Sequence, residues 1–157
     1  MPPKPLVDLD AIDTSTVVAG PEEIRARNPQ RFEMEQLDGV LHIDTDEGFA
    51  VGYKDVTEDE FWVKGHIPER PLLPGVLMCE AAAQLCSFYY NEVVENDKFL
   101  GFGGLQDVKF RRPVEPGCRL IIVAKAQDMR PRRAVFPCQA FVEGKMVFEC
   151  VVIGMPM

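Results

Sequence analysis

The sequence has few of the residues from which metal sites and disulfide frameworks are built. Its 157 residues include only two histidines, His42 and His66. Its five cysteines are odd in number and none forms a Cys-x-x-Cys pair. A disulfide framework is therefore not expected, and the thiols are best interpreted as small buried hydrophobic side chains. With so few candidate ligands, we expect no metal site and no cofactor.

Long apolar runs are also missing. No stretch approaches the ~20 apolar residues that a membrane-spanning helix needs. The first residues, Met1-Pro2-Pro3-Lys4-Pro5, lack the apolar segment of a signal peptide. We therefore expect a cytoplasmic protein that is not inserted in a membrane. The formal net charge of -8 argues against general nucleic-acid binding.

The charges are unevenly distributed. Residues 1–60 hold 15 acidic and 5 basic residues, whereas residues 109–133 hold 8 basic and 2 acidic ones. A basic stretch in an acidic protein indicates an acidic partner. The alternative is that these arginines only keep the edges of a sheet soluble, and charge alone leaves both open.

Hydrophobic periodicity predicts one α+β domain over residues 21–157, preceded by a loose tail over residues 1–20. A long helix is expected over Val76–Val94, and because it is apolar on most sides it should be buried. Alternating or apolar runs predict strands joined by short turns, which favour an antiparallel sheet. The expected shorter elements are a helix at Pro21–Ala26, a loop at Gly101–Gly104, and strands at Gly39–Asp44, Gly48–Lys54, Val108–Arg111, Leu120–Gln127, Val135–Val142 and Met146–Ile153. The sheet should curl around the long helix.

The residues best suited to catalysis lie between Gly65 and Gln84. His66 lies on a proline-stiffened loop and, with an ordinary pKa of ~6.5, suits a base. Glu80 and Gln84 share one face of the long helix, where an ionised carboxylate must find a partner or raise its pKa. The amide of Gly75 opens that helix and is suited to holding a carbonyl oxygen on which negative charge develops.

Base, acid and oxyanion donor together suit β-elimination of water from a 3-hydroxyacyl compound, without a metal. The alternatives are an ordinary exposed or core histidine at position 66 and a glutamate on a narrow exposed stripe at position 80.

These residues resemble a known family. The pattern Gly65-His66-Ile67-Pro68, Pro74-Gly75-Val76-Leu77, Glu80-Ala81 and Ala83-Gln84 is similar to the signature of the FabZ-type (3R)-hydroxyacyl-[acyl carrier protein] dehydratases of bacterial fatty-acid synthesis. Weaker likenesses lie at Asn28–Phe32, Lys54–Glu60 and Lys109–Gly117, so the resemblance covers about residues 22–153. Three positions depart from the family pattern, namely Gln30, Ile67 and Cys118, and they bear on substrate range more than on activity.

The resemblance implies a hotdog fold, with His66 as catalytic base, Glu80 as catalytic acid, Gly75 as oxyanion donor and Gln84 as the supporting amide. It also implies an acyl carrier protein with a phosphopantetheine-linked acyl chain as partner. In this family the histidine and glutamate of one site come from two subunits, so a homodimer is expected, with a trimer of dimers as a possible assembly.

Two sets of residues complete the expectation. Candidates for an apolar acyl tunnel beside the helix are Leu85, Phe88, Tyr89 and Phe99, for each of which core packing is the alternative role. Candidates for docking the acidic carrier are Arg111, Arg112, Arg130, Arg132 and Arg133. The rival functions are a hotdog acyl-thioesterase, which has no evident need for both His66 and Glu80, and a non-catalytic acyl-binding hotdog subunit.

Overall fold

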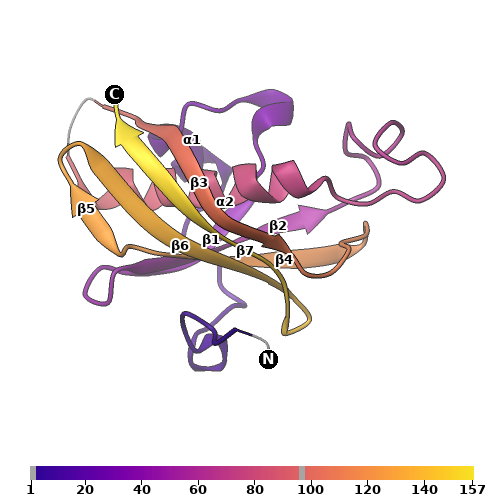
Figure 1. Ribbon diagram of the computed structural model, residues 1–157, viewed down its shortest axis with the longest axis horizontal. Helices are drawn as coiled ribbons and strands as arrows, with labels where there is room; N and C mark the ends of the chain where they lie inside the picture. The colour runs from indigo at the N-terminus through magenta and orange to yellow at the C-terminus, as the bar shows by residue number, and fades with distance from the viewer. Residues whose placement is uncertain (1–2, 96–97) are drawn as a thin grey trace.

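A strongly curved antiparallel sheet wraps around one long helix in the computed structural model, which describes residues 3–95 and 98–157 (Figure 1). The strands are β1 (Gly39–Asp44), β2 (Phe49–Val56), β3 (Leu100–Phe110), β4 (Cys118–Lys125), β5 (Asp128–Arg130), β6 (Arg133–Val142) and β7 (Lys145–Pro156). They are ordered β1-β2-β4-β6-β7-β3, and the short β5 pairs with β6. The helices are α1 (Pro21–Arg27) and α2 (Gly75–Val93), with 3-10 turns η1 (Leu9–Ala11) and η2 (Phe32–Met34). This architecture confirms the hotdog fold.

Helix α2 is buried because the sheet curls around it. Its buried side chains include Phe88, which packs with Phe136 of β6 and Phe148 of β7 in the main core. The helix begins at Gly75 after Pro74 and ends at Val93, within one residue of the expected Val76–Val94. An apolar surface on nearly every side of the helix is what the concave sheet requires.

Residues 3–12 lie on the opposite, convex face of the sheet (Figure 1). There Leu6, Val7, Leu9 and Ile12 pack against a second apolar cluster that includes Phe49 and Phe141. The Gln139 side chain accepts a hydrogen bond from Leu6 N (2.8 Å) and donates one to Lys4 O (3.0 Å). This N-terminal segment therefore covers apolar surface that the sheet would otherwise expose.

The expected loop at Gly101–Gly104 is wrong, because these residues belong to the first half of β3. Several glycines in succession usually indicate a loop. Here the absence of side chains lets β3 approach its neighbour closely, since a Cβ on Gly101 would lie 2.4 Å from Met157 Sδ. Close strand approach, not chain reversal, explains glycine at this position.

The expected strand Val108–Arg111 overlaps the end of the longer β3, and the other expected elements are confirmed with small shifts of their ends. Helix α1 ends at Arg27, one residue beyond the expected Ala26. Strands β1, β2, β4, β6 and β7 overlap the five segments expected for them. Among the described residues, no helix is long and apolar enough to cross a membrane.

Candidate active site

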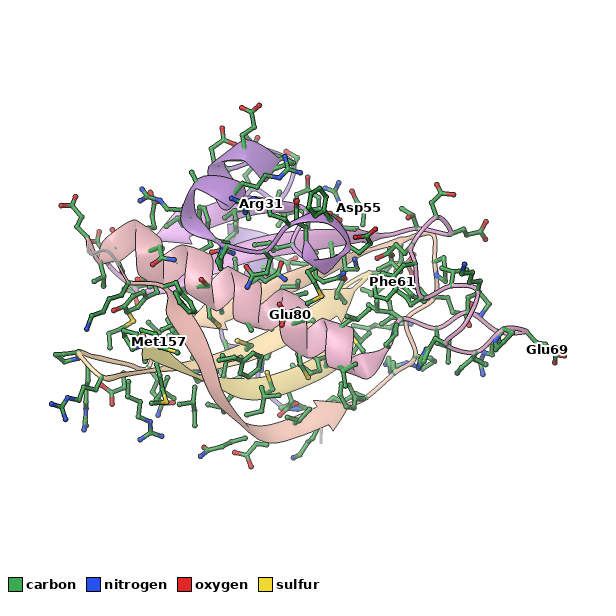
Figure 2. All side chains as sticks on the ribbon, turned by 90° about the horizontal axis from the view of Figure 1, so that it is seen from above. Arg31, Asp55, Phe61, Glu69, Glu80 and Met157 are labelled. Carbon is green, nitrogen blue, oxygen red and sulfur yellow. The ribbon has the colours of Figure 1, made fainter. Side chains whose placement is uncertain are left out.

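His66 lies on the loop that leads from β2 to α2, at the same end of the molecule as the start of α2 (Figure 1). The loop is anchored at its start by the buried Lys54, whose Nζ lies 2.5 Å from Glu60 Oε1. At its other end Leu73 N donates to Val114 O over 2.8 Å. Figure 2 shows the loop tip at Glu69 projecting well beyond α2, while Glu80 lies on the helix itself. Most of the loop is exposed, and so is His66.

The hydrogen bonds of His66 determine its tautomer. Nδ1 lies 2.8 Å from the carbonyl oxygen of Leu72, and the backbone N–H of His66 donates to Trp62 O over 2.8 Å. A carbonyl oxygen can only accept, so Nδ1 must carry a proton. In the neutral ring, Nε2 then has a free lone pair, which is the arrangement of a base.

Glu80 is held by a buried amide. Gln84 is 2% exposed, and its Nε2 donates to Glu80 Oε1 over 2.8 Å and to Met34 O over 2.6 Å. Its Oε1 accepts the backbone N–H groups of Gln36 (2.9 Å) and Leu37 (3.2 Å). With both amide ends engaged, Gln84 cannot rotate without breaking buried bonds. Glu80 Oε1 is therefore occupied as an acceptor, which fixes the orientation of the carboxyl group.

Gly75 packs closely against the side chain of Phe110 at the start of α2. A Cβ at this position would lie 2.7 Å from the ring of Phe110. No backbone acceptor for the Gly75 N–H occurs among the hydrogen bonds of residues 3–95 and 98–157. The N-terminus of a 19-residue helix thus presents a free amide together with the positive end of the helix dipole.

His66 and Glu80 face different cavities within one chain. The His66 cavity, of about 420 Å³, is also lined by Gly75, Val76, Phe110, Arg111 and Arg112 among others. The Glu80 cavity, of about 110 Å³, lies between α2 and β3 and has no lining residue in common with it. The residues that line the Glu80 cavity are Pro29, Gln30, Glu80, Ala83, Gln84, Ser87, Phe99, Leu100, Gly101, Phe102, Val152 and Gly154.

An apolar surface is left uncovered at the unpaired edge of the sheet. β3 is the last strand in the sheet order, and Phe102 and Leu105 on it are 49% and 38% exposed. Val76 at the start of α2 is 73% exposed and Phe110 at the end of β3 is 53% exposed. Exposed apolar residues on an unpaired strand are typical of a surface that another chain covers.

The tunnel candidates separate into two groups. Leu85, Phe88 and Tyr89 are buried in the main core and do not line the Glu80 cavity. Phe99 does line it. Phe102 of the Glu80 cavity was not singled out from sequence. Val76 and Phe110 of the His66 cavity lie in segments that resemble the family pattern, but no role was expected for them.

The five candidate docking arginines do not form one patch. Arg111 and Arg112 line the His66 cavity, and Arg111 Nε lies 2.6 Å from Glu149 Oε2. Arg130, Arg132 and Arg133 lie in the β5–β6 hairpin, at the opposite end of the molecule (Figure 1). The basic stretch is contiguous in sequence but runs through β4, which carries it from one end of the sheet to the other.

No group of three or more His, Cys, Asp or Glu side chains suited to holding a metal ion occurs in the part of the chain that the structure describes. The buried thiols of Cys86 and Cys138 lie 3.5 Å apart between α2 and β6. Burial raises the pKa of Cys138 well above its ordinary value, so this thiol behaves as part of the core.

Comparison with known proteins identifies the family of the chain. The model of the FabA-like domain family matches residues 28–151. The chain is 36% identical over 135 residues to "3-hydroxyacyl-[acyl-carrier-protein] dehydratase FabZ" of Chlamydia muridarum, covering 84% of this chain and 88% of that protein. It is 38% identical over 126 residues to the protein of the same name from Streptococcus agalactiae serotype V, covering 80% and 89% of the two chains.

Solved structures with low sequence identity share the fold. The dehydratase heterocomplex ApeI:P from Xenorhabdus doucetiae superposes with a TM-score of 0.73 at 16% identity, covering 85% of this chain and 90% of that one. A putative thioesterase from Ralstonia eutropha JMP134 superposes with a TM-score of 0.63 at 15% identity, covering 74% and 82%. At such low identities these structures show only a shared fold. Membership of a family is shown by the match over residues 28–151 and by the relatives of 36–38% identity. The chain belongs to the FabA-like family.

Proposed function

We propose that this protein catalyses the dehydration of (3R)-hydroxyacyl-[acyl carrier protein] thioesters to trans-2-enoyl thioesters in fatty-acid synthesis. Two observations carry the proposal: the bond of His66 Nδ1 to Leu72 O, which leaves Nε2 as a base, and the bond of Gln84 to Glu80 Oε1, which holds the carboxyl in one orientation. FabZ enzymes of 36–38% identity over four fifths of the chain support the same reaction.

His66 is the base. Its Nε2 takes a proton from C2 of the acyl chain, and the electrons of that C–H bond form the C2–C3 double bond. Leu72 O holds the ring through Nδ1 and stabilises the imidazolium that results. Because His66 is exposed, it remains accessible to a substrate that arrives from solution.

Glu80 is the acid. Its Oε2 gives a proton to the 3-hydroxyl, the C3–O bond breaks, and water leaves with that proton. Gln84 positions Glu80 by holding Oε1, so the proton-bearing oxygen has one defined direction. The Gly75 amide receives the thioester oxygen as negative charge develops on it.

One complete site needs two chains in this proposal. Within a single chain His66 and Glu80 line separate cavities, and apolar side chains are exposed along β3 and the start of α2. A second copy placed against this edge would cover those side chains and bring its His66 to the Glu80 cavity. We therefore infer a homodimer, and a trimer of dimers is one way for such dimers to assemble.

The partner that delivers substrate is an acidic acyl carrier protein. Arg111 and Arg112 line the cavity that contains His66, so they lie where a phosphopantetheine arm would enter. The hairpin arginines Arg130, Arg132 and Arg133 contribute long-range attraction at most from their position in one chain. Phe99, and not the core residues Leu85, Phe88 and Tyr89, is then the tunnel residue next to Glu80.

One assay tests the proposal against its rivals. The protein is given a trans-2-enoyl thioester, and loss of the conjugated double bond and release of free thiol are followed in parallel. Hydration without thiol release is the expected result, since dehydration is reversible. Thiol release would instead identify a thioesterase, and no reaction of either kind from a folded dimer would identify a non-catalytic acyl-binding subunit.

A further inference from the structure

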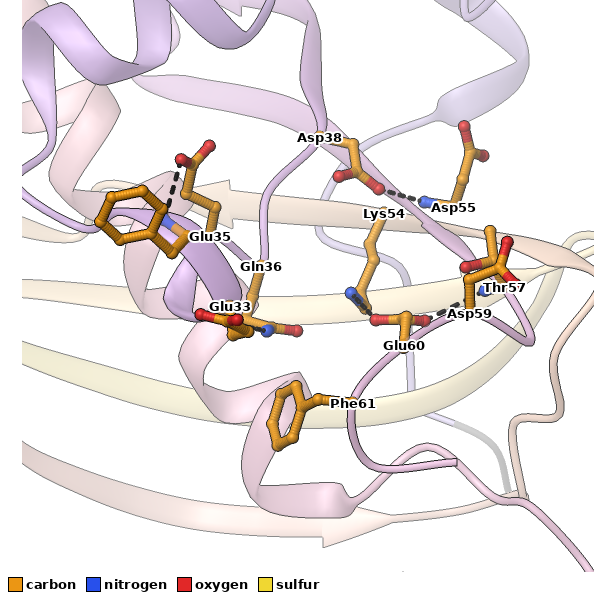
Figure 3. A pocket seen from close by; sticks show the side chains of 11 residues that line it. Glu33, Glu35, Gln36, Asp38, Lys54, Asp55, Thr57, Asp59, Glu60 and Phe61 are labelled. Atoms are coloured by element: carbon orange, nitrogen blue, oxygen red, sulfur yellow. Dashed lines mark hydrogen bonds and ion pairs between the residues drawn. The ribbon is translucent and has the colours of Figure 1, made fainter. Parts of the chain in front are cut away.

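A cavity of about 640 Å³ lies between the η2 turn and the segment that follows β2, and shares no lining residue with the His66 or Glu80 cavity (Figure 3). Six carboxylates and one ammonium group line it. Its lining residues are Phe32, Glu33, Glu35, Gln36, Asp38, Lys54, Asp55, Thr57, Asp59, Glu60 and Phe61. A cavity so rich in acceptors favours a ligand that carries hydrogen-bond donors and positive charge.

Half of these carboxylates already have a cationic partner. Arg25 Nη2 lies 2.9 Å from Glu35 Oε2 and Arg119 Nε lies 2.7 Å from Asp55 Oδ1, both from outside the cavity, while Lys54 binds Glu60. No ion pair within residues 3–95 and 98–157 involves the other three, Glu33, Asp38 and Asp59. Burial raises the pKa of Asp38, although the backbone N–H of Asp55 and the nearby charge of Lys54 act in the opposite direction.

Gln36 supplies an independent sign of a missing ligand. Its side chain is 2% exposed and its Nε2 donates to Glu33 O over 2.7 Å, but its Oε1 has no hydrogen-bond partner. Figure 3 shows the Gln36 side chain reaching into the cavity beside Lys54 and Glu60. Buried amide oxygens are nearly always paired, so an orphan aimed into a cavity indicates a donor that binds there.

Two phenylalanines give the cavity an apolar rim. Phe32 is 85% exposed and Phe61 is 52% exposed, although aromatic side chains are usually covered. Aromatic faces attract guanidinium and ammonium groups and also cover alkyl chains. The rim therefore suits the apolar part of a ligand whose charged end lies deeper.

We propose that this cavity binds a small organic cation, an alkyl guanidinium or alkylammonium. Its N–H groups donate to Gln36 Oε1 on the cavity wall. Asp38, Glu33 and Asp59 balance its charge, and its alkyl chain lies against Phe32 and Phe61. The proposal rests on this cavity alone and is independent of the proposed function.

The cavity is linked to both halves of the candidate active site. The backbone N–H of Gln36 donates to Gln84 Oε1, and Gln84 donates in turn to Glu80. On the other side, Phe61 directly precedes Trp62, whose carbonyl oxygen accepts the backbone N–H of His66. A bound cation would therefore contact two segments that position the proposed acid and base.

The test measures binding of butylguanidinium to the full chain by isothermal titration calorimetry, with butylurea as the uncharged ligand of the same shape. Saturable binding of butylguanidinium and none of butylurea is expected. Gln36→Leu, which keeps the size but removes the acceptor, should weaken binding about tenfold, as for loss of one hydrogen bond to a charged group. Asp38→Asn, which keeps an acceptor for the backbone N–H of Asp55, should weaken it similarly.

A matched control distinguishes binding in this cavity from general attraction of a cation to an acidic protein. Asp46→Asn removes the same charge in the exposed turn between β1 and β2 and should leave the affinity unchanged within about twofold. Phe61→Ala, which is half exposed and not expected to affect folding, should weaken binding severalfold. The proposal is overturned if the wild type shows no saturable binding, or if Asp38→Asn and Phe61→Ala bind like Asp46→Asn.

Discussion

The two halves of the candidate site are held in place by different means. Glu80 lies on a helix inside the sheet. Its partner Gln84 makes four hydrogen bonds of 2.6–3.2 Å, one to Glu80 and three to backbone groups. His66 lies on an exposed loop, and within residues 3–95 and 98–157 the hydrogen bond to its ring is the 2.8 Å bond to Leu72 O. The acid is thus fixed by the interior of the chain, whereas the base is fixed only by its own loop.

This difference shows which half of the candidate site is held in place by a single chain. The Glu80 half is held by hydrogen bonds that one chain supplies, namely those of Gln84 to Glu80 and to the backbone of Met34, Gln36 and Leu37. The His66 half leaves Val76 and Phe110 exposed beside it, as an unfinished interface would. Changes on the loop should therefore affect rate with little effect on stability, and changes behind Glu80 should affect both.

Replacing the base gives the largest expected effect on rate. His66→Ala should lower the rate of enoyl-thioester hydration by about 10²–10⁴-fold, the usual loss for one acid/base group. The melting temperature should barely change, because the side chain is exposed. Glu69→Ala, on the same loop, is the control and should keep its rate. Near-normal hydration by folded His66→Ala would rule out the proposed mechanism.

Substitutions of the acid and of its positioning residue should differ in their effects on rate and on stability. Glu80→Gln should lower the rate by a similar 10²–10⁴-fold while changing the free energy of unfolding by less than about 1 kcal/mol, since the amide keeps an acceptor for Gln84. Gln84→Leu should lose on the order of 3 kcal/mol, because buried N–H groups of Gln36 and Leu37 lose their acceptor. Denaturant unfolding and hydration kinetics check both. Equal destabilisation by the two changes would mean that Glu80 is structural.

Mixing inactive variants tests whether the halves come from two chains. Equal amounts of His66→Ala and Glu80→Gln, allowed to exchange subunits, should recover about a quarter of native activity. Random pairing makes half of the dimers mixed, and one of the two sites in each mixed dimer has both native groups. Subunit exchange is verified with differently tagged chains. Failure to recover activity after exchange would place His66 and Glu80 of one site in the same chain.

Charge reversal at the His66 cavity gives the smallest expected effect. Arg111→Glu with Arg112→Glu should slow turnover of a carrier-linked substrate about tenfold or less and leave a short neutral thioester unaffected. Reversal of Arg130, Arg132 and Arg133 should have a weaker effect, because in one chain they lie far from His66. Raising the salt concentration should reduce the difference from wild type, since exposed charges are screened beyond ~8 Å. Equal kinetics on both substrates for every set would mean that the arginines only keep the strands soluble.

Local pattern in the sequence was sufficient for much of the fold. The position of α2 follows from an apolar run that begins after Pro74-Gly75, and short turns between strands follow from residues such as those at 143–145. The strand containing Gly101 was mistaken for a loop, because glycine indicates both chain reversal and close strand approach. Only the pairing of Gly101 with Met155 of β7, and the position of Met157 just beyond that strand, distinguish the two.

The sequence alone was also enough to identify the candidate site residues. They are a histidine between Gly65 and Pro68, a helix-opening Gly75, and a Glu80–Gln84 pair at the spacing of one helical turn. The tertiary structure decided how they are used. It brought Met34, Gln36 and Leu37 to Gln84 from 47 to 50 residues away along the chain. It also gave His66 its tautomer through the bond to Leu72 O. It placed Arg111 and Arg130 at opposite ends of the sheet. It also left Gln36 with an unpaired oxygen in an acidic cavity. Periodicity in sequence reports which face of an element is buried, whereas the partners of a buried polar atom depend on segments that only the folded sheet brings together.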